Sequence, residues 1–379
     1  MAGPDDRDPH AAERVPPASL NSAPATRDRV YRRRHMPDST GTSSDDIATV
    51  VIPARNEERF IGGCLESVLS QTYQRLQVLV VDGASSDRTV AIAERYADTD
   101  PRVEIIHNPD RTVPTGLNRA LAAAKGRYFV RIDAHSTVPP EYVATAVGLL
   151  RSGKWGGVGG RKDGVGVTPT GTAVACVMST RFGVGDSLYH YGEIPQPAEH
   201  VPFGAYETLL VRELGGWNES LPVNQDYEFD HRVRKSGREL LFDPHLTVEW
   251  HCRQTLRELF RQYRRYGQGK SMVARLHPDS LRARHLAAPA LVAVIGAALV
   301  TAPRRPRLAA AMVFPYAVAL GVSSCLAGRR VDGVRAKLAV PVAYLCMHVG
   351  WGVGFWEGVT AQLLGSTPRP TPTSAVGSV

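Results

Sequence analysis

The chain has 379 residues, of which 43% are apolar and 22% are charged, so it can bury a large core or form two domains and is not disordered throughout. Its five cysteines are scattered and include no Cys-x-x-Cys pair, which excludes a disulfide framework and a structural zinc site. The net charge of +8 and the pI of about 9.3 favour anionic lipid or phosphorylated ligands over nucleic acid, because no nucleic-acid-binding module is recognisable.

Residues 1–45 are rich in Pro, Arg, Asp and Ser and contain almost no apolar run, so we expect a disordered tail. The segment also lacks the apolar centre of a signal peptide. Met36 lies within it and is a possible alternative start, a question that the sequence leaves open.

Strands and helices alternate from residue 46 onwards. β-Branched and aromatic residues predict buried strands, and apolar residues at helical spacing predict the helices between them. The predicted strands cover 47–53, 76–81, 103–106 and 127–132, and the predicted helices lie around 60–69, 91–96 (capped by Ser85 or Ser86) and 117–124. This alternation favours an α/β fold with a doubly wound, mostly parallel sheet, which we place at residues 46–250.

The strand over 127–132 ends in Asp133-Ala134-His135. Side chains two residues apart at a strand end point in the same direction, and carboxylate and imidazole are both ligands for divalent cations. Taken alone, the same three residues are also typical of a solvated turn.

Further polar residues fall at the carboxyl ends of two other predicted strands, where ligands bind in a doubly wound sheet. Asn56-Glu57 follows the first strand and Asp82 follows the second. Singly, Asp82-Gly83 is a common turn pair and Asn56 a plausible helix cap. Together with the residues after the fourth strand, they indicate a nucleotide diphosphate bridged to the protein by a metal, because carboxylates beside a phosphate need a cation between them.

An amphipathic helix is predicted after residue 251, where Thr255-Leu256-Arg257-Glu258 forms a capping box. Its apolar and aromatic residues lie on one side and its basic residues on or near the other, which is typical of a helix that lies on anionic lipid. The basic, solvated face of a soluble domain is the alternative. We assign residues 251–284 to this interface helix region.

Three uncharged apolar stretches follow, at 286–302, 308–327 and 338–356, with lengths of 17, 20 and 19 residues. These lengths are close to the roughly 20 residues that cross a bilayer. We therefore expect about three transmembrane helices within 285–358 and a disordered tail over 359–379. The first stretch contains Pro289 and could be re-entrant, and a buried helical hairpin of a soluble domain is the alternative.

Basic residues around these stretches predict the orientation in the membrane. Arg282 and Arg284 precede the first stretch, and further basic residues follow the second, so the positive-inside rule places the α/β domain in the cytoplasm. Arg304, Arg305 and Arg307, between the first and second stretches, disagree unless that pair is a shallow hairpin. We expect a multi-pass protein of the plasma membrane or inner membrane.

Five motifs in this order carry a resemblance to a known family. They are Val-Val-Ile-Pro-Ala-Arg-Asn-Glu-Glu at 50–58, Val-Val-Asp-Gly-Ala-Ser-Ser-Asp-Arg-Thr at 80–89, Arg-Ile-Asp-Ala-His at 131–135, Gly-Gly-Trp at 215–217 and Asn-Gln-Asp-Tyr-Glu at 224–228. The chain resembles family 2 glycosyltransferases of the GT-A fold over about residues 47–270. Within that family it looks most like the membrane-attached bacterial enzymes of succinoglycan-type exopolysaccharide assembly.

The resemblance implies a role for each matching residue of the donor site. Asp82 would hold the uracil or other base. Asp133 matches the first residue of the family's D-x-D metal motif, whereas His135 stands where the second Asp usually is. Imidazole suits Mn²⁺ better than Mg²⁺, so the choice between these metals stays open. The base and ribose pocket would be lined by Pro53, Arg55, Asn56 and Glu57.

The resemblance also covers residues beyond this strand edge. Asp226 matches the catalytic base, with helix capping as its alternative role and Glu228 and Asp230 as competing carboxylates. His251 stands where related enzymes often place a further ligand of the metal or diphosphate, and a turn histidine is the alternative. The donor-binding Q-x-x-R-W motif of processive members is matched by Gln262, Arg265 and Tyr266, with Tyr in place of Trp.

The activity implied by the resemblance is an inverting transfer of a sugar from a nucleotide-diphosphate donor, expected to be UDP-linked, to a lipid-linked glycan. Only three transmembrane candidates are present, which argues against a synthase with a translocating pore. Two alternatives stay open: a polyprenyl-phosphate sugar synthase, for which Asp226 would be dispensable, and a non-catalytic membrane scaffold with a transferase-like domain.

Overall fold

The computed structural model describes residues 46–365. The predicted tail over 1–45, with Met36, and the chain from 366 onwards lie outside the described residues.

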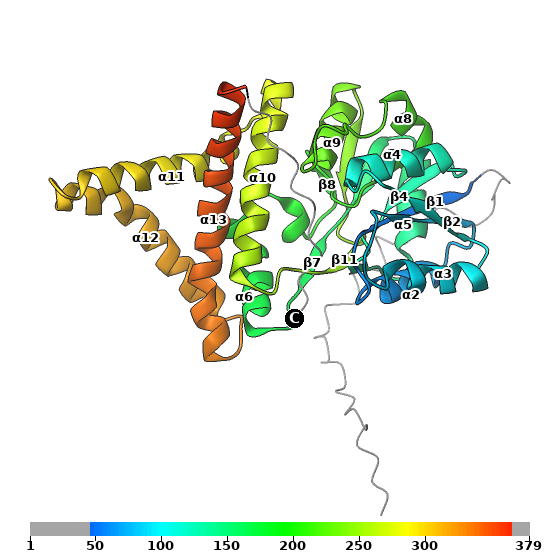
Figure 1. Ribbon diagram of the computed structural model, residues 1–379, viewed down its shortest axis with the longest axis horizontal. Coiled ribbons are helices and arrows are strands. Elements are labelled where there is room, and N and C mark those ends of the chain that lie inside the picture. The colour runs from blue at the N-terminus through cyan, green and yellow to red at the C-terminus, as the bar shows by residue number, and fades with distance from the viewer. Residues whose placement is uncertain (1–45, 366–379) are drawn as a thin grey trace, which may run out of the picture. The chain divides into compact units, whose positions relative to one another are not determined.

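Within residues 46–365, the central sheet has eight strands in the order β3-β2-β1-β4-β9-β6-β10-β8. Figure 1 labels β1, β2, β4 and β8 of this sheet. The first four strands in the order given are mutually parallel, β9 is antiparallel to both β4 and β6, and β8 is antiparallel to β10. The prediction of a mostly parallel sheet is therefore confirmed. The strand bounds are β1 Ala48–Ala54, β2 Leu76–Asp82, β3 Val103–His107, β4 Tyr128–Arg131, β6 Trp155–Gly159, β8 Gln196–Ala198, β9 Ala205–Glu207 and β10 Glu239–Phe242.

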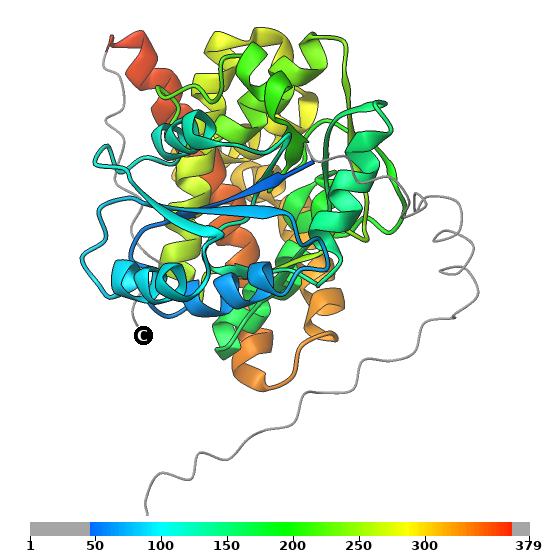
Figure 2. The same ribbon diagram turned by 90° about the vertical axis from the view of Figure 1, so that its right-hand side faces the viewer.

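Helices cover both faces of this sheet because successive residues of a buried strand point to opposite sides. Val50 and Ile52 of β1 lie in one apolar core with α2, α3 and α5, whereas Val51 lies in a second core with α4, α8 and α9. Figure 2 shows the first strands between these helices. The helix bounds are α2 Ile61–Leu69, α3 Thr89–Thr99, α4 Val113–Ala123, α5 Tyr142–Arg151, α8 Thr208–Glu213 and α9 Gln225–Lys235.

A second, three-stranded sheet lies beside the carboxyl end of β4. Its strands are β5 (Ser136–Thr137), β11 (Val248–His251) and β7 (Lys162–Val165), in that order. The register pairs Trp250 with Ser136 on one side and with Gly164 on the other. This small sheet therefore carries β7 and β11 to the residues that follow β4.

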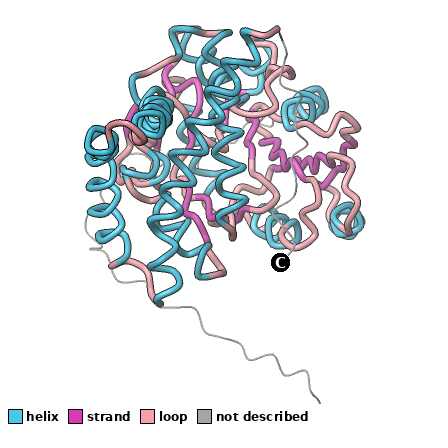
Figure 3. The backbone as a smooth tube through the Cα atoms, turned by 60° about the vertical axis from the view of Figure 1, so that its left-hand side comes forward, coloured by secondary structure: helices cyan, strands magenta, loops and turns pink. Residues whose placement is uncertain are grey.

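Helix α10 (Leu256–Leu276) begins at the predicted capping box, where the Thr255 side chain accepts from the Glu258 N–H at 3.3 Å. Helix α10 packs along α13 (Val334–Leu363), and Figures 1 and 3 show the two side by side. The contact of α10 with lipid stays a prediction. The backbones touch: a Cβ on Gly354 would come within 1.8 Å of the Arg264 carbonyl oxygen. Such close contact over small residues is typical of helices packed within membranes.

Helices α11 (Ala283–Thr301), α12 (Pro306–Gly328) and α13 contain the three predicted apolar stretches. All three are long and apolar enough to cross a membrane, with mean hydropathies of 1.7, 1.8 and 1.5. Large apolar side chains of α11 and α12 face outwards, among them Leu299 and Phe314. Helix α13 ends at Leu363, beyond the expected boundary at 358, because its last turns still pack on α10 through Gly358 and Ser271.

The α/β domain and the C-terminal helices share an apolar core that includes Trp250 of β11, Tyr263 of α10 and Met347 of α13. Helices α6 (Pro169–Met178) and α7 (Arg181–Val184) belong to the same region. A polar link adds to it: the His348 Nε2 is 2.8 Å from the Phe182 carbonyl oxygen, and its Nδ1 is 2.9 Å from the Tyr316 hydroxyl. Since a carbonyl can only accept, Nε2 carries the proton and donates.

Candidate active site

The loops after β1 and β2 are joined at the carboxyl end of the sheet. Asn56 has a left-handed backbone (φ 55°), which asparagine tolerates better than most residues. Its N–H donates to the Ser85 Oγ at 2.9 Å, and its side-chain oxygen accepts from the Ser86 N–H at 2.8 Å. Asp82 is buried, and its carboxylate accepts from the Ser85 N–H at 3.2 Å. The structure thus brings Asn56 and Asp82 to one edge.

Arg55 lies against the same loop. A Cβ on Gly83 would come within 3.3 Å of the Arg55 Cβ, and Pro53 pairs with Val81 across β1 and β2. The Nε and Nη1 of Arg55 are buried without a hydrogen-bond partner. Because unpaired buried donors cost free energy, this guanidinium is suited to a ligand that accepts hydrogen bonds.

Asp133 follows β4 as predicted, and it forms a two-point ion pair with Arg131 of the same strand. Arg131 Nε donates to Asp133 Oδ1 at 2.8 Å and Nη2 donates to Oδ2 at 3.3 Å. The third nitrogen, Nη1, lies 3.8 Å from the Asp226 Oδ2. Burial lowers the pKa of Arg131, but the charges of Asp133 and Asp226 outweigh it and raise the pKa overall. One buried cation therefore connects the predicted metal ligand to the predicted base.

His135, Glu57 and His251 meet next to this ion pair. His135 Nδ1 lies 3.2 Å from Glu57 Oε1, yet Nδ1 and Glu57 Oε2 are buried without a hydrogen-bond partner. The His251 N–H donates to the His135 carbonyl oxygen at 3.1 Å, and its ring packs on Phe60 with centroids 4.5 Å apart. Burial and then the neighbouring His135 lower the pKa of His251, so this imidazole is neutral at pH 7. Neutral imidazole is the metal-binding form.

Asp226 is the second residue of α9, and its Oδ1 accepts from the Tyr227 N–H at 2.8 Å. The position before the helix is occupied by Asn224, so Asp226 is not the N-cap. Burial raises the pKa of Asp226, but the charges of His200 and Arg131 outweigh it and lower the pKa overall. Asp226 is therefore an anion at neutral pH, with about 30% of its side chain exposed and able to meet a substrate.

His200 connects Asp226 to a second carboxylate. Its Nε2 lies 4.0 Å from Asp226 Oδ2, and its Nδ1 lies 2.7 Å from Asp230 Oδ2. Asp230 is fully buried, and it also accepts from the Tyr206 hydroxyl at 2.7 Å and the Val201 N–H at 2.8 Å. Asp230 thus orients His200 and does not itself face the site, which removes it as a competitor of Asp226.

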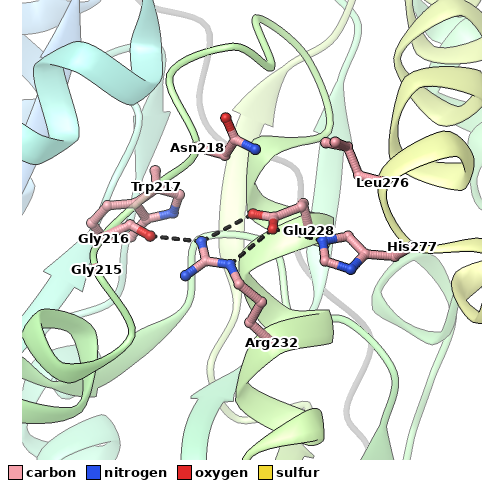
Figure 4. Close-up of a pocket in the computed structure, with 8 residues that line it drawn as sticks. All are labelled: Gly215, Gly216, Trp217, Asn218, Glu228, Arg232, Leu276 and His277. Carbon is pink, nitrogen blue, oxygen red and sulfur yellow. Dashed lines mark hydrogen bonds and ion pairs between the residues drawn. The ribbon is translucent and has the colours of Figure 1, made fainter.

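Glu228 is buried on the other side of α9, beside a cavity of about 360 Å³ (Figure 4). Its Oε1 accepts from Arg232 Nε at 2.8 Å and lies 3.0 Å from His277 Nε2, and its Oε2 accepts from Arg232 Nη2 at 2.9 Å. Arg232 Nη2 also donates to the Gly216 carbonyl oxygen at 2.6 Å. A carboxylate with this many partners holds α9 to its neighbours and is not available as a base.

The Gly-Gly-Trp motif fixes the loop before α9. Asn118 of α4 accepts from the Trp217 N–H and donates to its carbonyl oxygen, each at 2.8 Å. The Trp217 ring packs between Phe129 and Phe229, with centroids 5.3 and 5.0 Å away. Gly216 needs its positive φ of 68° and has no room for a Cβ, which would lie 2.4 Å from the Asn118 Oδ1. The motif therefore helps to position α9 and with it Asp226.

Comparison with known proteins identifies the family of this chain. The sequence profile of Glycosyl transferase family 2 matches residues 49–192. The succinoglycan biosynthesis protein ExoA of Rhizobium meliloti is 30% identical over 323 residues, which cover 83% of this chain and 97% of that protein. The chain belongs to glycosyltransferase family 2. The resemblance drawn from the sequence motifs is thereby confirmed.

Two more distant relatives of this glycosyltransferase extend over much of its length. A dolichyl N-acetyl-alpha-D-glucosaminyl phosphate 3-beta-D-2,3-diacetamido-2,3-dideoxy-beta-D-glucuronosyltransferase of Methanococcus voltae is 23% identical, covering 61% of this chain and 74% of that protein. The solved structure of the mannosyltransferase PcManGT from Pyrobaculum calidifontis aligns with a TM-score of 0.57 at 22% identity, covering 86% of this chain and 92% of that chain. The latter similarity confirms the GT-A fold.

Helix α10 brings the predicted Gln262 and Tyr266 of the glycosyltransferase towards α9. Gln262 Nε2 donates to the Tyr266 hydroxyl at 3.1 Å, and the Tyr266 carbonyl oxygen accepts from Asn224 Nδ2 at 3.3 Å. The Gln262 Oε1 is buried without a partner. Burial lowers the pKa of Arg265, with the charge of Arg253 acting in the same direction. This part of α10 thus adjoins the motif that holds Asp226.

The sequence analysis did not identify three residues of this region, Arg131, Lys162 and His200, and it considered Asp230 only as a competing carboxylate. Arg131 lies within one of the quoted motifs, and its spacing of two from Asp133 places both on one side of the chain. This spacing could have identified Arg131 as a residue of the site. Lys162 and His200 lie in segments without a periodic pattern, so only the fold brings them to Asp226.

Proposed function

We propose that this chain is an inverting glycosyltransferase that moves a sugar from a nucleotide-diphosphate donor to a lipid-linked glycan in polysaccharide biosynthesis. The observation that carries the proposal is the position of Asp226: an anionic, partly exposed carboxylate that Arg131 connects to Asp133 at the end of β4. Similarity to ExoA, a succinoglycan biosynthesis protein, supports a role in polysaccharide biosynthesis. The C-terminal apolar helices support an acceptor that is anchored in a membrane.

A divalent cation fits the residues between β1, β4 and β11. The buried, unpartnered Nδ1 of His135 and Oε2 of Glu57 are atoms that a cation would satisfy. Asp133, two residues before His135, supplies a carboxylate that is paired with Arg131. Within residues 46–365 no three His, Cys, Asp or Glu side chains form a complete metal-binding group. Asp133 and His135, with His251 beside them, would therefore hold Mn²⁺ or Mg²⁺ together with donor phosphates and water, as is usual for such cations. PcManGT was solved with GDP-Man and Mn²⁺.

The chemistry divides among the residues as follows. A cation held by Asp133 and His135 would supply positive charge against the leaving diphosphate. Asp226 accepts the proton of the acceptor hydroxyl, while His200 and Arg131 keep its carboxylate ionised. Asp82, Asn56 and Arg55 form the wall that would receive the base and ribose, with the Arg55 donors free to bind.

Nucleotide-sugar screening tests this function. Purified full-length protein is heated with UDP-, GDP-, dTDP-, ADP- and CMP-linked sugars in Mn²⁺, Mg²⁺ or EDTA. We expect one class to raise the melting temperature, most strongly with metal, and Asp133→Ala to lose the metal-dependent part. If no nucleotide sugar stabilises the wild-type protein under any condition, the proposed function is wrong.

The membrane proposal has its own test. We propose that α11 to α13 anchor the enzyme with its catalytic domain in the cytoplasm, where nucleotide sugars are made. We expect carbonate at high pH to leave the protein in the membrane pellet, and protease to reach the catalytic domain in inverted vesicles alone. Release of the intact chain by carbonate or salt would contradict the anchor.

A further inference from the structure

Two cations lie between the carboxylates of the site. Arg131 is only 8% exposed and reaches both Asp133 and Asp226. Lys162, the first residue of β7, is half-buried, and its ammonium lies 4.0 Å from the centroid of the Trp250 ring and 4.9 Å from that of Phe203. Burial lowers the pKa of Lys162 to about 8, and the charges of Asp133 and Asp226 act in the opposite direction.

Phe203 holds the two cations beside one another. The Arg131 guanidinium carbon lies 5.9 Å from its ring centroid, so both cations contact the same ring. Phe203 is 5% exposed and has a left-handed backbone with φ 53°. A bulky residue in this region is strained, and such strain persists at functional sites where the surroundings hold it in place. The geometry therefore fixes the positions of Arg131 and Lys162.

Both cations have hydrogen-bond donors that no other described residue uses. Arg131 Nη1 is buried without a hydrogen-bond partner, although Nε and Nη2 are used by Asp133. Among the described residues, Lys162 contacts two aromatic rings but makes no hydrogen bond or ion pair. A buried donor without a partner costs free energy, so Arg131 Nη1 is suited to an acceptor that arrives from outside. The half-buried Lys162 ammonium has donors that no carboxylate or carbonyl of the described residues uses.

The charges also point to an anion of more than one charge. Arg131 and Lys162 are two fixed cations at this site, and their uncommitted donors are available to the oxygens of a diphosphate. Fixed cations near the phosphates need no rearrangement when negative charge develops on the leaving group. Arginine and lysine are both common phosphate ligands, and charge-assisted hydrogen bonds are about twice as strong as neutral ones.

We propose that Arg131 and Lys162 form a built-in cationic site for the diphosphate of the donor, so that the protein binds a diphosphate even without a metal ion. The inference rests on the proposed function and adds two residues to it. Arg131 also positions Asp133 and Asp226, whereas Lys162 is free for the diphosphate. Lys162 is therefore the residue to change first.

The test is calorimetric titration of full-length protein with inorganic pyrophosphate in EDTA. We expect the wild-type protein to bind, and Lys162→Gln to bind about 10- to 100-fold more weakly, as for the loss of one charge-assisted hydrogen bond. Lys162→Arg should restore most of the affinity because it keeps the cation. Lys154→Gln is the matched control: Lys154 also lies over a ring, 4.3 Å from the centroid of Trp155, but it is exposed.

Each result decides the inference. Equal pyrophosphate affinity for wild type and Lys162→Gln, at unchanged melting temperature, would overturn it, and so would a wild-type protein that binds no pyrophosphate in EDTA. In either case a nucleotide sugar that still stabilises the protein with Mn²⁺ would leave the proposed function standing. If Lys162→Gln fails to fold, Arg131→Lys provides a second test, because it keeps a cation beside Asp133. Weaker pyrophosphate binding by this variant supports the inference, and unchanged binding contradicts it.

Discussion

Asp226 and Glu228 lie two residues apart on α9, and replacing each by its amide should have different effects on turnover and stability. Asp226→Asn removes the proposed base but keeps the size of the side chain and an oxygen that can accept from the Tyr227 N–H. Loss of a general base lowers turnover by about 10² to 10⁴. We expect a melting temperature close to that of the parent, because about 30% of the Asp226 side chain is already exposed.

Glu228→Gln should instead destabilise the protein. The Glu228 carboxylate is 2% exposed and is held by Arg232 through two nitrogens and by His277. Breaking a buried ion pair by removing one partner costs about 3–5 kcal/mol, and we expect the lower end because the Arg232 side chain is 22% exposed. For a domain of this size, about 3 kcal/mol corresponds to a fall in melting temperature of roughly 6–12 °C.

The assay measures nucleoside diphosphate released from the stabilising nucleotide sugar, with a membrane lipid extract as the source of acceptor, below the melting temperature of both variants. The matched measurement is thermal unfolding of each protein without ligand. If Glu228→Gln abolished turnover at an unchanged melting temperature while Asp226→Asn stayed active, the assignment of roles to these carboxylates would be wrong.

Three further substitutions test other parts of the structure. His200→Gln removes the largest of the charges that lower the pKa of Asp226, so that pKa should rise and the acid limb of the pH–turnover profile should move to higher pH. Burial lowers the pKa of Lys270 to about 7. Between pH 7 and roughly 10 the unfolded chain therefore binds more protons than the folded protein, so wild-type stability should rise with pH. Lys270→Met should lose this part of the rise in melting temperature, and a pH dependence identical to that of the wild type would contradict the prediction. Gly354→Ala should lower the melting temperature by several degrees because its Cβ would meet the Arg264 carbonyl oxygen, whereas Gly321→Ala, with open space around it, should have little effect.

The sequence predicted the elements of the fold better than their contacts. Buried strands such as β1 and β2 were found because β-branched residues fill them. The start of α3 was expected at Ser85 or Ser86, but it lies at Thr89, since Asn56 uses the Ser85 hydroxyl and the Ser86 N–H to join two loops. A local sequence pattern cannot predict a hydrogen-bond partner that lies at the end of another strand.

Local patterns likewise predicted single residues of the site but not the contacts between them. Asp133 and Asp226 could be predicted from motifs, because each follows a recognisable strand or precedes a helical run. Their connection through Arg131, and the approach of His200 to Asp226, depend on how β4 and α9 meet in the fold. The contact of α10 with α13 was not predicted either, because the glycines of α10 that fit against α13 leave no apolar pattern in the sequence.

The close contact of α10 with α13 has a practical consequence for anyone who wishes to isolate the catalytic half. A fragment that ends before Ala283 would keep α10 but remove the helix against which Gly267 packs, where a Cβ would come within 2.0 Å of the Trp351 carbonyl oxygen. The fragment would also uncover Trp250 and Tyr263, which share a core with α13. A soluble version is therefore better sought by redesigning the outward faces of α11 and α12 than by truncation.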